Sequence, residues 1–158
     1  FPHHEMCAAE AFALTGRPFA RTYVHSGLVA LDGEKMSKSK GNLELVSRLR
    51  KQGADPMAIR LALLDNHYRA DWEWTPEKLT AAEQRLEQWR GMLNNPAALP
   101  AATTIAAMRT ALRTDLDAPA ALAAVDAWVA ASMAIDADDA AAVGEMADAI
   151  DALLGIKL

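Results

Sequence analysis

Lysines and serines crowd one short segment of the chain, which is bordered by glycines. The string LDGEKMSKSKGN at residues 31–42 contains Lys35, Ser37, Lys38, Ser39 and Lys40. On a flexible loop such side chains can approach a polyphosphate closely, because each ammonium offers a mobile positive charge and each hydroxyl a short hydrogen bond. Short lysine runs are also common on solvated surfaces, so composition alone leaves both interpretations open.

A predicted hairpin precedes this loop. The run RTYVHSGLVAL at residues 21–31 is rich in aromatic and β-branched side chains, and it is followed by the turn dipeptide Asp32-Gly33. This pattern predicts one or two short strands around Gly27, closed by a tight turn. The lysines would then follow the turn directly.

Helical periodicity covers most of the remaining sequence. Residues 3–15 are rich in Ala and contain no breaker before Gly16, which predicts a helix with a glycine at its end. Three further helices are predicted behind capping residues, at residues 43–51 after Asn42, 56–68 after Asp55 and 76–94 after Thr75. Beyond Pro100, apolar residues at helical spacing predict three more helices.

Apolar stripes mark the helix faces that we expect in the core. Ile59 and Leu63 share one face of their helix, and His67 would extend it. Trp72 and Trp74 are expected to pack in the interior, as tryptophan does on average. The stripe of the following helix consists of Leu79, Leu86, Trp89 and Leu93.

The composition argues against several classes of protein. A chain of 158 residues, 52% of them hydrophobic, is long enough to bury a core. Its single cysteine excludes an internal disulfide framework, and nothing else indicates an oxidising compartment, so we expect a cytoplasmic protein. No run approaches the ~20 apolar residues of a membrane span, and we expect no membrane partner.

The net charge of −5 is unevenly distributed. Residues 1–113 carry 15 Lys and Arg against 12 Asp and Glu, whereas residues 114–158 carry only Lys157 against nine acids. The potential for anion binding therefore lies in the first part of the chain. The acidic last part would repel a nucleic-acid backbone, so we expect no nucleic-acid partner.

The lysine segment resembles the nucleotide-binding loop of class I aminoacyl-tRNA synthetases, and the longer string DGEKMSKSKGN resembles their cysteinyl branch. The resemblance implies that Lys35 and Lys38 are catalytic, by neutralising charge that develops on the phosphates of ATP. It also implies that a set of six residues binds the nucleotide, and that the backbone of the first of them, Val29, contacts adenine. The set is Val29, Lys35, Met36, Ser37, Lys38 and Ser39.

The string FPHHEMCAAE at residues 1–10 supports the same branch. Cysteinyl-tRNA synthetases carry PHHENE, in which the first His and the last Glu share a helix face and reach a zinc ion that binds the substrate thiol. By this resemblance His3 is a zinc ligand, and a buried or capping histidine is the alternative. Cys7 stands where the family has its carboxylate, and it is either a second ligand or a small packed residue. Further ligands are expected upstream.

Five strings together resemble the cysteine ligases of mycothiol biosynthesis, which share the synthetase core but use another acceptor. They are FPHHEM, LDGEKMSKSKGN, DPMAIRLALL, HYRADWEW and DLDAPAAL. The resemblance implies an ATP-dependent, amide-forming enzyme that activates L-cysteine as cysteinyl adenylate and joins it to the amine of glucosaminyl-inositol. Mg²⁺ would accompany ATP. The chain would then be a C-terminal fragment whose partner is the missing N-terminal half, and it would be inactive without that half.

This resemblance implies a mostly α fold, in which the C-terminal end of a class I synthetase Rossmann-like α/β catalytic domain is followed by a helical bundle. We place the end of the nucleotide-binding domain at residues 1–42, a helical connecting region at 43–95 and the C-terminal bundle at 96–158. Two alternative functions stay open. One is a fragment of a cysteinyl-tRNA synthetase, which should carry a basic RNA-docking surface, and the other is a helical interaction module without catalysis.

Overall fold

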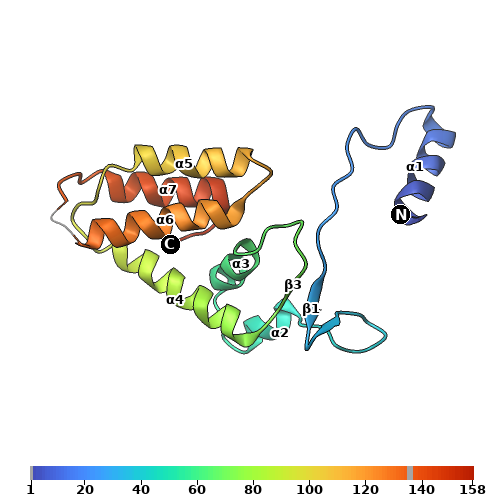
Figure 1. Ribbon diagram of the computed structural model, residues 1–158, viewed down its shortest axis with the longest axis horizontal. Helices are drawn as coiled ribbons and strands as arrows, with labels where there is room; N and C mark the ends of the chain where they lie inside the picture. The colour runs from blue at the N-terminus through green and yellow to red at the C-terminus, as the bar shows by residue number, and fades with distance from the viewer. Residues whose placement is uncertain (1, 135–136) are drawn as a thin grey trace.

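Helices dominate the computed structural model, which describes residues 2–134 and 137–158 (Figure 1). A small sheet lies between the first helix and the others. The described elements are, in order, α1 (Pro2–Thr15), β1 (Val29–Leu31), β2 (Glu34–Lys35), α2 (Val46–Lys51), α3 (Pro56–Leu64), β3 (Trp72–Glu73), α4 (Pro76–Met92), α5 (Ala102–Arg113), α6 (Ala118–Ala134) and α7 (Ala142–Leu154).

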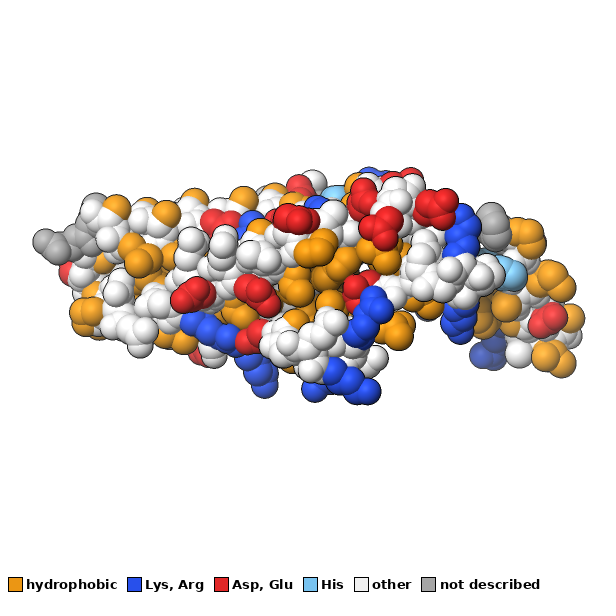
Figure 2. All heavy atoms as spheres, turned by 90° about the horizontal axis from the view of Figure 1, so that it is seen from below, with side chains coloured by type: hydrophobic (Ala, Val, Ile, Leu, Met, Phe, Trp, Pro, Cys, Tyr) orange, Lys and Arg blue, Asp and Glu red, His pale blue; other side chains and the backbone are white. Residues whose placement is uncertain are grey.

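The first helix stands apart from the rest of the molecule, at the end of an extended segment (Figure 1). Its end agrees with the prediction, because Gly16 adopts the left-handed conformation and its N–H donates to the carbonyl of Phe12 at 2.8 Å. None of the residues 2–28 is fully buried. Hydrophobic side chains are accordingly visible on the surface at the α1 end of the molecule (Figure 2).

The sheet has three strands in the order β2-β1-β3. β1 pairs antiparallel with β2 and parallel with β3, where Val29 lies opposite Trp72. Asp32 and Gly33 both have positive φ angles, of 55° and 74°, as a two-residue hairpin turn with the native strand twist requires. The predicted hairpin is confirmed, although its first strand begins at Val29 and β3 was not predicted.

Two predicted helix boundaries are wrong. α2 begins at Val46 rather than at residue 43, because the side chain of Asn42 closes the preceding loop instead of capping a helix. α3 has its predicted cap, since Asp55 Oδ1 accepts from the N–H of Met57 at 2.8 Å. It ends at Leu64 rather than at residue 68, and His67 therefore does not extend a helix face.

The core lies among α3, α4, α5, α6 and α7, and one cluster of buried side chains runs from Leu49 to Ile156. Figure 1 shows α5, α6 and α7 side by side, with α4 crossing beneath them. The indole N–H groups of Trp89 in α4 and Trp128 in α6 are both satisfied, because Trp89 donates to Asp126 and Trp128 donates to the carbonyl of Leu99. The core therefore includes residues from both predicted helical regions.

The apolar predictions held for most positions. Trp74 is 6% exposed, and Trp72 packs half-buried against the core, as predicted. Leu63 and Leu93 are exceptions, because they are 48% and 40% exposed, although Ile59 and Trp89, one turn earlier in each helix, are buried. No helix among the described residues has both the length and the apolar character that crossing a membrane requires.

Candidate functional site

The lysine loop, residues 35–41, leaves the hairpin at β2 and is held by short polar contacts. The side chain of Asn42 accepts from the Ser37 N–H at 2.9 Å and donates to the carbonyl of Lys35 at 3.2 Å. The hydroxyls of Ser37 and Ser39 share a hydrogen bond of 2.8 Å. Asn42 thus ties the two ends of the loop together, a role that the sequence left indistinguishable from a helix cap.

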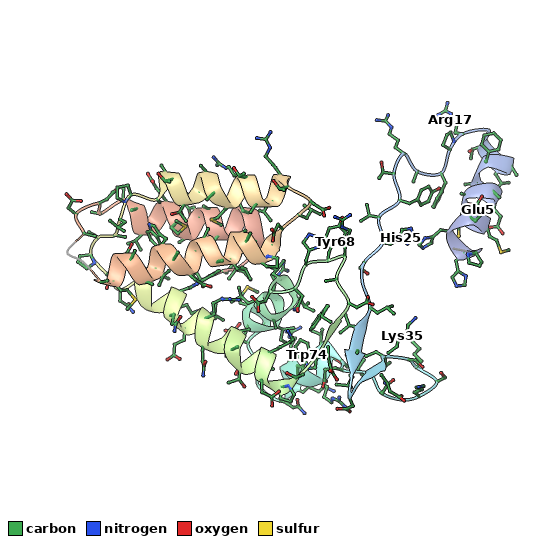
Figure 3. All side chains as sticks on the ribbon, viewed as in Figure 1. Glu5, Arg17, His25, Lys35, Tyr68 and Trp74 are labelled. Atoms are coloured by element: carbon green, nitrogen blue, oxygen red, sulfur yellow. The ribbon has the colours of Figure 1, made fainter. Side chains whose placement is uncertain are left out.

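The three lysines of the loop differ in their partners. Lys40 Nζ lies 2.7 Å from Glu34 Oε2, so its charge is already paired on the hairpin. Lys35 and Lys38 are exposed, and neither makes an ion pair with any residue that the structure describes. Figure 3 shows Lys35 standing out from the hairpin. The two lysines that were predicted to be catalytic are therefore the two that can meet an anion without breaking an existing pair.

Unlike the exposed Lys35 and Lys38, Val29 and Met36 are partly buried and pack against the core. Both line an apolar cavity of about 180 Å³ together with Trp72 and Trp74, beneath the start of the loop. The carbonyl of Val29 accepts from the Met36 N–H at 3.4 Å. Their side chains thus pack the base of the loop, and the predicted backbone contact from Val29 to adenine stays a prediction.

The candidate metal ligands lie on α1, where both His3 and Cys7 are exposed. Their spacing puts them on one helix face, so they could supply two of the four donors of a tetrahedral zinc site. Within residues 2–134 and 137–158, no group of three or more His, Cys, Asp or Glu side chains could hold a metal ion. The donors fit the start of a zinc site, and its remaining ligands would have to come from outside the described residues.

Two other histidines are in contact between α1, which carries His4, and the segment before the hairpin, which carries His25. The rings of His4 and His25 lie 4.9 Å apart at their centroids, with 42° between the ring planes. Figure 3 shows His25 pointing toward α1. The sequence did not predict this ring contact.

The family model described as "tRNA synthetases class I (C) catalytic domain" matches residues 1–84. The chain belongs to this family. Its matched part includes α1, the hairpin, the lysine loop, α2, α3 and the first half of α4. The predicted fold class is confirmed, since the end of a class I synthetase catalytic domain is followed by a helical bundle.

Curated relatives match over the whole chain. The similarity is 56% identity to a protein of Catenulispora acidiphila, 58% to one of Thermobispora bispora and 55% to one of Streptomyces coelicolor, each over 100% of this chain. All three are named L-cysteine:1D-myo-inositol 2-amino-2-deoxy-alpha-D-glucopyranoside ligase. The chain spans 38–39% of the length of these relatives.

Within this class I synthetase framework, the residues just before β1 cross the segment after α3 at very short range. The Gly27 N–H donates to the carbonyl of Tyr68 at 2.7 Å, and the Leu28 N–H donates to Asp71 Oδ1 at 2.7 Å. A Cβ at Gly27 would lie 2.1 Å from the carbonyl oxygen of Ala70. Only glycine fits this crossing, which the sequence pattern indicated merely as a break between strands.

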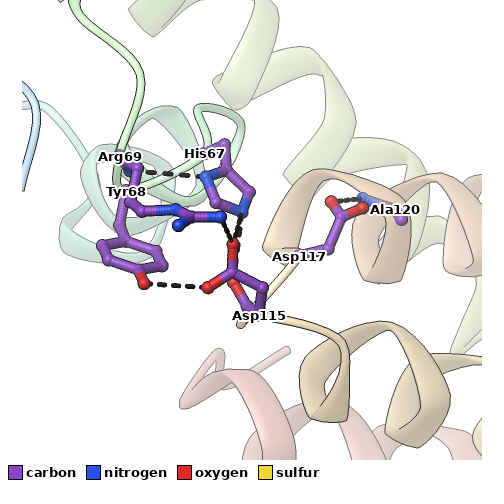
Figure 4. A network of polar contacts seen from close by, with 6 residues as sticks. All are labelled: His67, Tyr68, Arg69, Asp115, Asp117 and Ala120. Atoms are coloured by element: carbon purple, nitrogen blue, oxygen red, sulfur yellow. Dashed lines mark hydrogen bonds and ion pairs between the residues drawn. The ribbon is translucent and has the colours of Figure 1, made fainter.

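A second polar group joins the matched part of the chain to the bundle. It comprises His67, Tyr68, Arg69 and Asp115, and we call it the Asp115 cluster (Figure 4). The Asp115 carboxylate accepts a hydrogen bond from the Tyr68 hydroxyl at 2.9 Å and forms an ion pair with Arg69. The Asp115 backbone carbonyl lies 3.1 Å from His67 Nε2. The hydrogen bond from the Tyr68 hydroxyl to the carboxylate raises the pKa of Tyr68 above its ordinary value. The sequence carried no signal for this cluster, because Asp115 is distant along the chain.

Proposed function

We propose that the whole protein containing this chain is an ATP-dependent ligase that activates L-cysteine as cysteinyl adenylate and joins it to the amine of glucosaminyl-inositol. The observation that carries the proposal is identity of 55–58% over the full chain to relatives whose printed name is that of this ligase. The exposed Lys35 and Lys38 support the proposal, because they offer two unpaired charges on a class I synthetase loop.

The proposed reaction has two steps. A cysteine carboxylate oxygen attacks the α-phosphorus of ATP, the bond to the β-phosphate bridge breaks, and pyrophosphate leaves. The sugar amine then attacks the activated carbonyl carbon, loses a proton, and AMP leaves with the C–O bond electrons. Both steps depend on placing reactants and on stabilising negative charge rather than on covalent catalysis by the protein.

In this scheme the lysine loop acts on the first step. Lys35 and Lys38 would neutralise charge that develops on the phosphates, and Mg²⁺ bound with ATP would supply further positive charge there. Ser37 and Ser39 would donate hydrogen bonds once their mutual contact opens. Lys40 would contribute least, because its ammonium is already paired with Glu34.

The proposed choice of cysteine depends on α1. A zinc ion held by His3 and by upstream ligands would bind a substrate thiolate far better than a hydroxyl, and so would separate cysteine from serine. Cys7 could add a second donor from the same helix face. We also propose that this site is completed by an N-terminal half of the protein, and that the enzyme is cytoplasmic.

One assay separates this proposal from its alternatives. The full-length protein is supplied with ATP and radiolabelled cysteine, and with either glucosaminyl-inositol or tRNA as acceptor. Label on the sugar amine is the expected result. Label on tRNA would instead indicate a cysteinyl-tRNA synthetase. Absence of both products, together with absence of cysteine-dependent pyrophosphate–ATP exchange, would favour a non-catalytic module.

A further inference from the structure

The lysine loop is connected to the helical bundle through a short chain of contacts that ends at one carboxylate. The loop follows β1, and β1 begins one residue after Leu28. Gly27 and Leu28 are bound to the segment 68–71, and the side chains of that segment are bound to Asp115. We propose that Asp115 is a positioning residue for the lysine loop, acting through residues 67–71.

The contacts at Asp115 converge on one segment rather than on several. Its carboxylate meets the side chains of His67, Tyr68 and Arg69, which are consecutive in the chain (Figure 4). The rings of His67 and Tyr68 also lie 5.0 Å apart in a stacked arrangement. Three neighbouring side chains held by one group fix the direction of their backbone, which a single contact would not do.

The backbone of the turn that carries Asp115 is itself constrained. Asp115 and Leu116 have φ angles of 56° and 54°, in the left-handed region. Aspartate tolerates this conformation, but leucine rarely adopts it, and such strain persists only where surrounding contacts hold it. The turn between α5 and α6 therefore presents the carboxylate from a defined position on the bundle.

The same segment holds the hairpin on its other side. The carbonyl of Tyr68 accepts the N–H of Gly27, and Asp71 accepts the N–H of Leu28. The Trp72 N–H then donates to the carbonyl of Leu28 at 3.0 Å, which starts the parallel pairing of β3 with β1. A displacement of residues 67–71 would therefore move the start of β1, and the loop with it.

A role in the stability of the fold alone explains the Asp115 cluster less well than a role in positioning the lysine loop. The side chains of Arg69 and Asp115 are 63% and 38% exposed, and exposed ion pairs contribute little to the free energy of unfolding. Reaction rates respond more strongly, since a small misplacement of a catalytic group can cost up to about 100-fold. The catalytic consequence rests on the proposed function, whereas the mechanical connection does not.

The test compares Asp115→Ala and Tyr68→Phe in the full-length protein, with Asp117→Ala as the matched control. Asp117 lies two residues away, and its carboxylate accepts the N–H of Ala120 instead of joining the cluster. The first readout is amide hydrogen exchange at Gly27 and Leu28. We expect exchange to be faster by about 10-fold in Asp115→Ala, by a smaller factor in Tyr68→Phe, and to be unchanged in Asp117→Ala.

The second readout is cysteine-dependent pyrophosphate–ATP exchange. We expect Asp115→Ala to lower kcat/KM for ATP by about 10-fold and to leave KM for cysteine unchanged, because α1 is not part of this chain of contacts. Wild-type amide exchange at Gly27 and Leu28 in both cluster variants would overturn the proposal, and so would equal effects in Asp117→Ala. If Asp115→Ala fails to fold, the amide exchange of Tyr68→Phe, which removes only one hydroxyl, tests the proposal in its place.

The two proposals fail in different ways. A wild-type protein without cysteine-dependent exchange would remove the ligase function, and the amide exchange at Gly27 and Leu28 would still test the connection. An active wild-type protein with unaltered amide exchange in the cluster variants would remove the connection alone.

Discussion

The first helix and the bundle helices have similar compositions and opposite surroundings. α1 and α6 are both rich in alanine, yet α6 buries seven residues, whereas α1 buries none. Met6, Phe12 and Leu14 on α1 are all more than half exposed. The comparison teaches that an alanine-rich sequence specifies a helix in both places, while burial depends on a neighbour, and that α1 has no neighbour that buries it among the residues that the structure describes.

Matched leucine truncations should sharpen this comparison most. Leu122→Ala in α6 removes a side chain with no exposed surface, and we expect the free energy of unfolding to fall by about 2–5 kcal/mol. Leu14→Ala in α1 removes a side chain that is 87% exposed, and we expect a change within about 0.5 kcal/mol. Urea denaturation of the chain measures both. Equal losses would show that α1 is packed as tightly as the bundle.

Lysine substitutions should affect function without this loss of stability. In the full-length protein, Lys35→Ala and Lys38→Ala should each slow cysteine-dependent pyrophosphate–ATP exchange by about 100-fold, as expected when one stabilising donor is lost. Lys40→Ala is the matched control and should cost far less, since Glu34 already pairs with its ammonium. Unchanged rates in the first two variants would reject their catalytic role.

A pair of glycine substitutions should separate the crossing at Gly27 from an ordinary helix surface. Gly27→Ala forces a methyl group against the backbone of Ala70, and we expect a loss of about 1–3 kcal/mol. Gly91→Ala in α4 meets nothing within 4 Å and should stabilise the chain by about 0.5 kcal/mol. Thermal unfolding gives the sign of each effect, and a neutral Gly27→Ala would contradict the tight crossing.

The smallest predicted effect concerns pH. Hydrogen bonding to the Arg90 guanidinium lowers the pKa of Asp55 below its ordinary value of 3.8. A lowered pKa in the folded state adds stability that is present above pH 3.8 and is lost as the pH falls through the lower folded-state value. The expected contribution is about 0.5–1 kcal/mol, as for a partly exposed pair.

Asp55→Asn isolates that charge, because the amide oxygen can still accept from the Met57 N–H. The difference in unfolding free energy between the wild type and this variant should shrink as the pH falls from about 6 to about 3. Asp55→Ala should cost about 1 kcal/mol more, since it also removes the cap. A difference that stays constant with pH would contradict the charge effect.

The features that the sequence predicted correctly depend on local signals. Asp55-Pro56 marked the start of α3, and Asp32-Gly33 marked the hairpin turn, because capping and turn geometry are decided within a few residues. The catalytic role of Lys35 and Lys38, which the motif suggested, stays a prediction, and no local signal indicated that Lys40 pairs with Glu34.

The features that were missed depend on distant partners. The strand at Trp72 exists because Val29 lies opposite it, and no local pattern in two residues can indicate that. Asn42 had two local uses, and the loop contact to Ser37 won over the helix cap. Asp115 contacts residues 46 to 48 positions earlier, so its role depends on the packing of the bundle.

Trp72 lies at the boundary between the hairpin and the helices, because its indole lines both the cavity beneath the lysine loop and a second cavity of about 390 Å³ that reaches Leu112 and Leu116. Lys78 Nζ lies 5.5 Å from the centre of its ring. Its fluorescence should therefore respond to any shift of the hairpin against the bundle. With the other three tryptophans buried, this residue gives the chain an intrinsic optical probe that needs no attached dye.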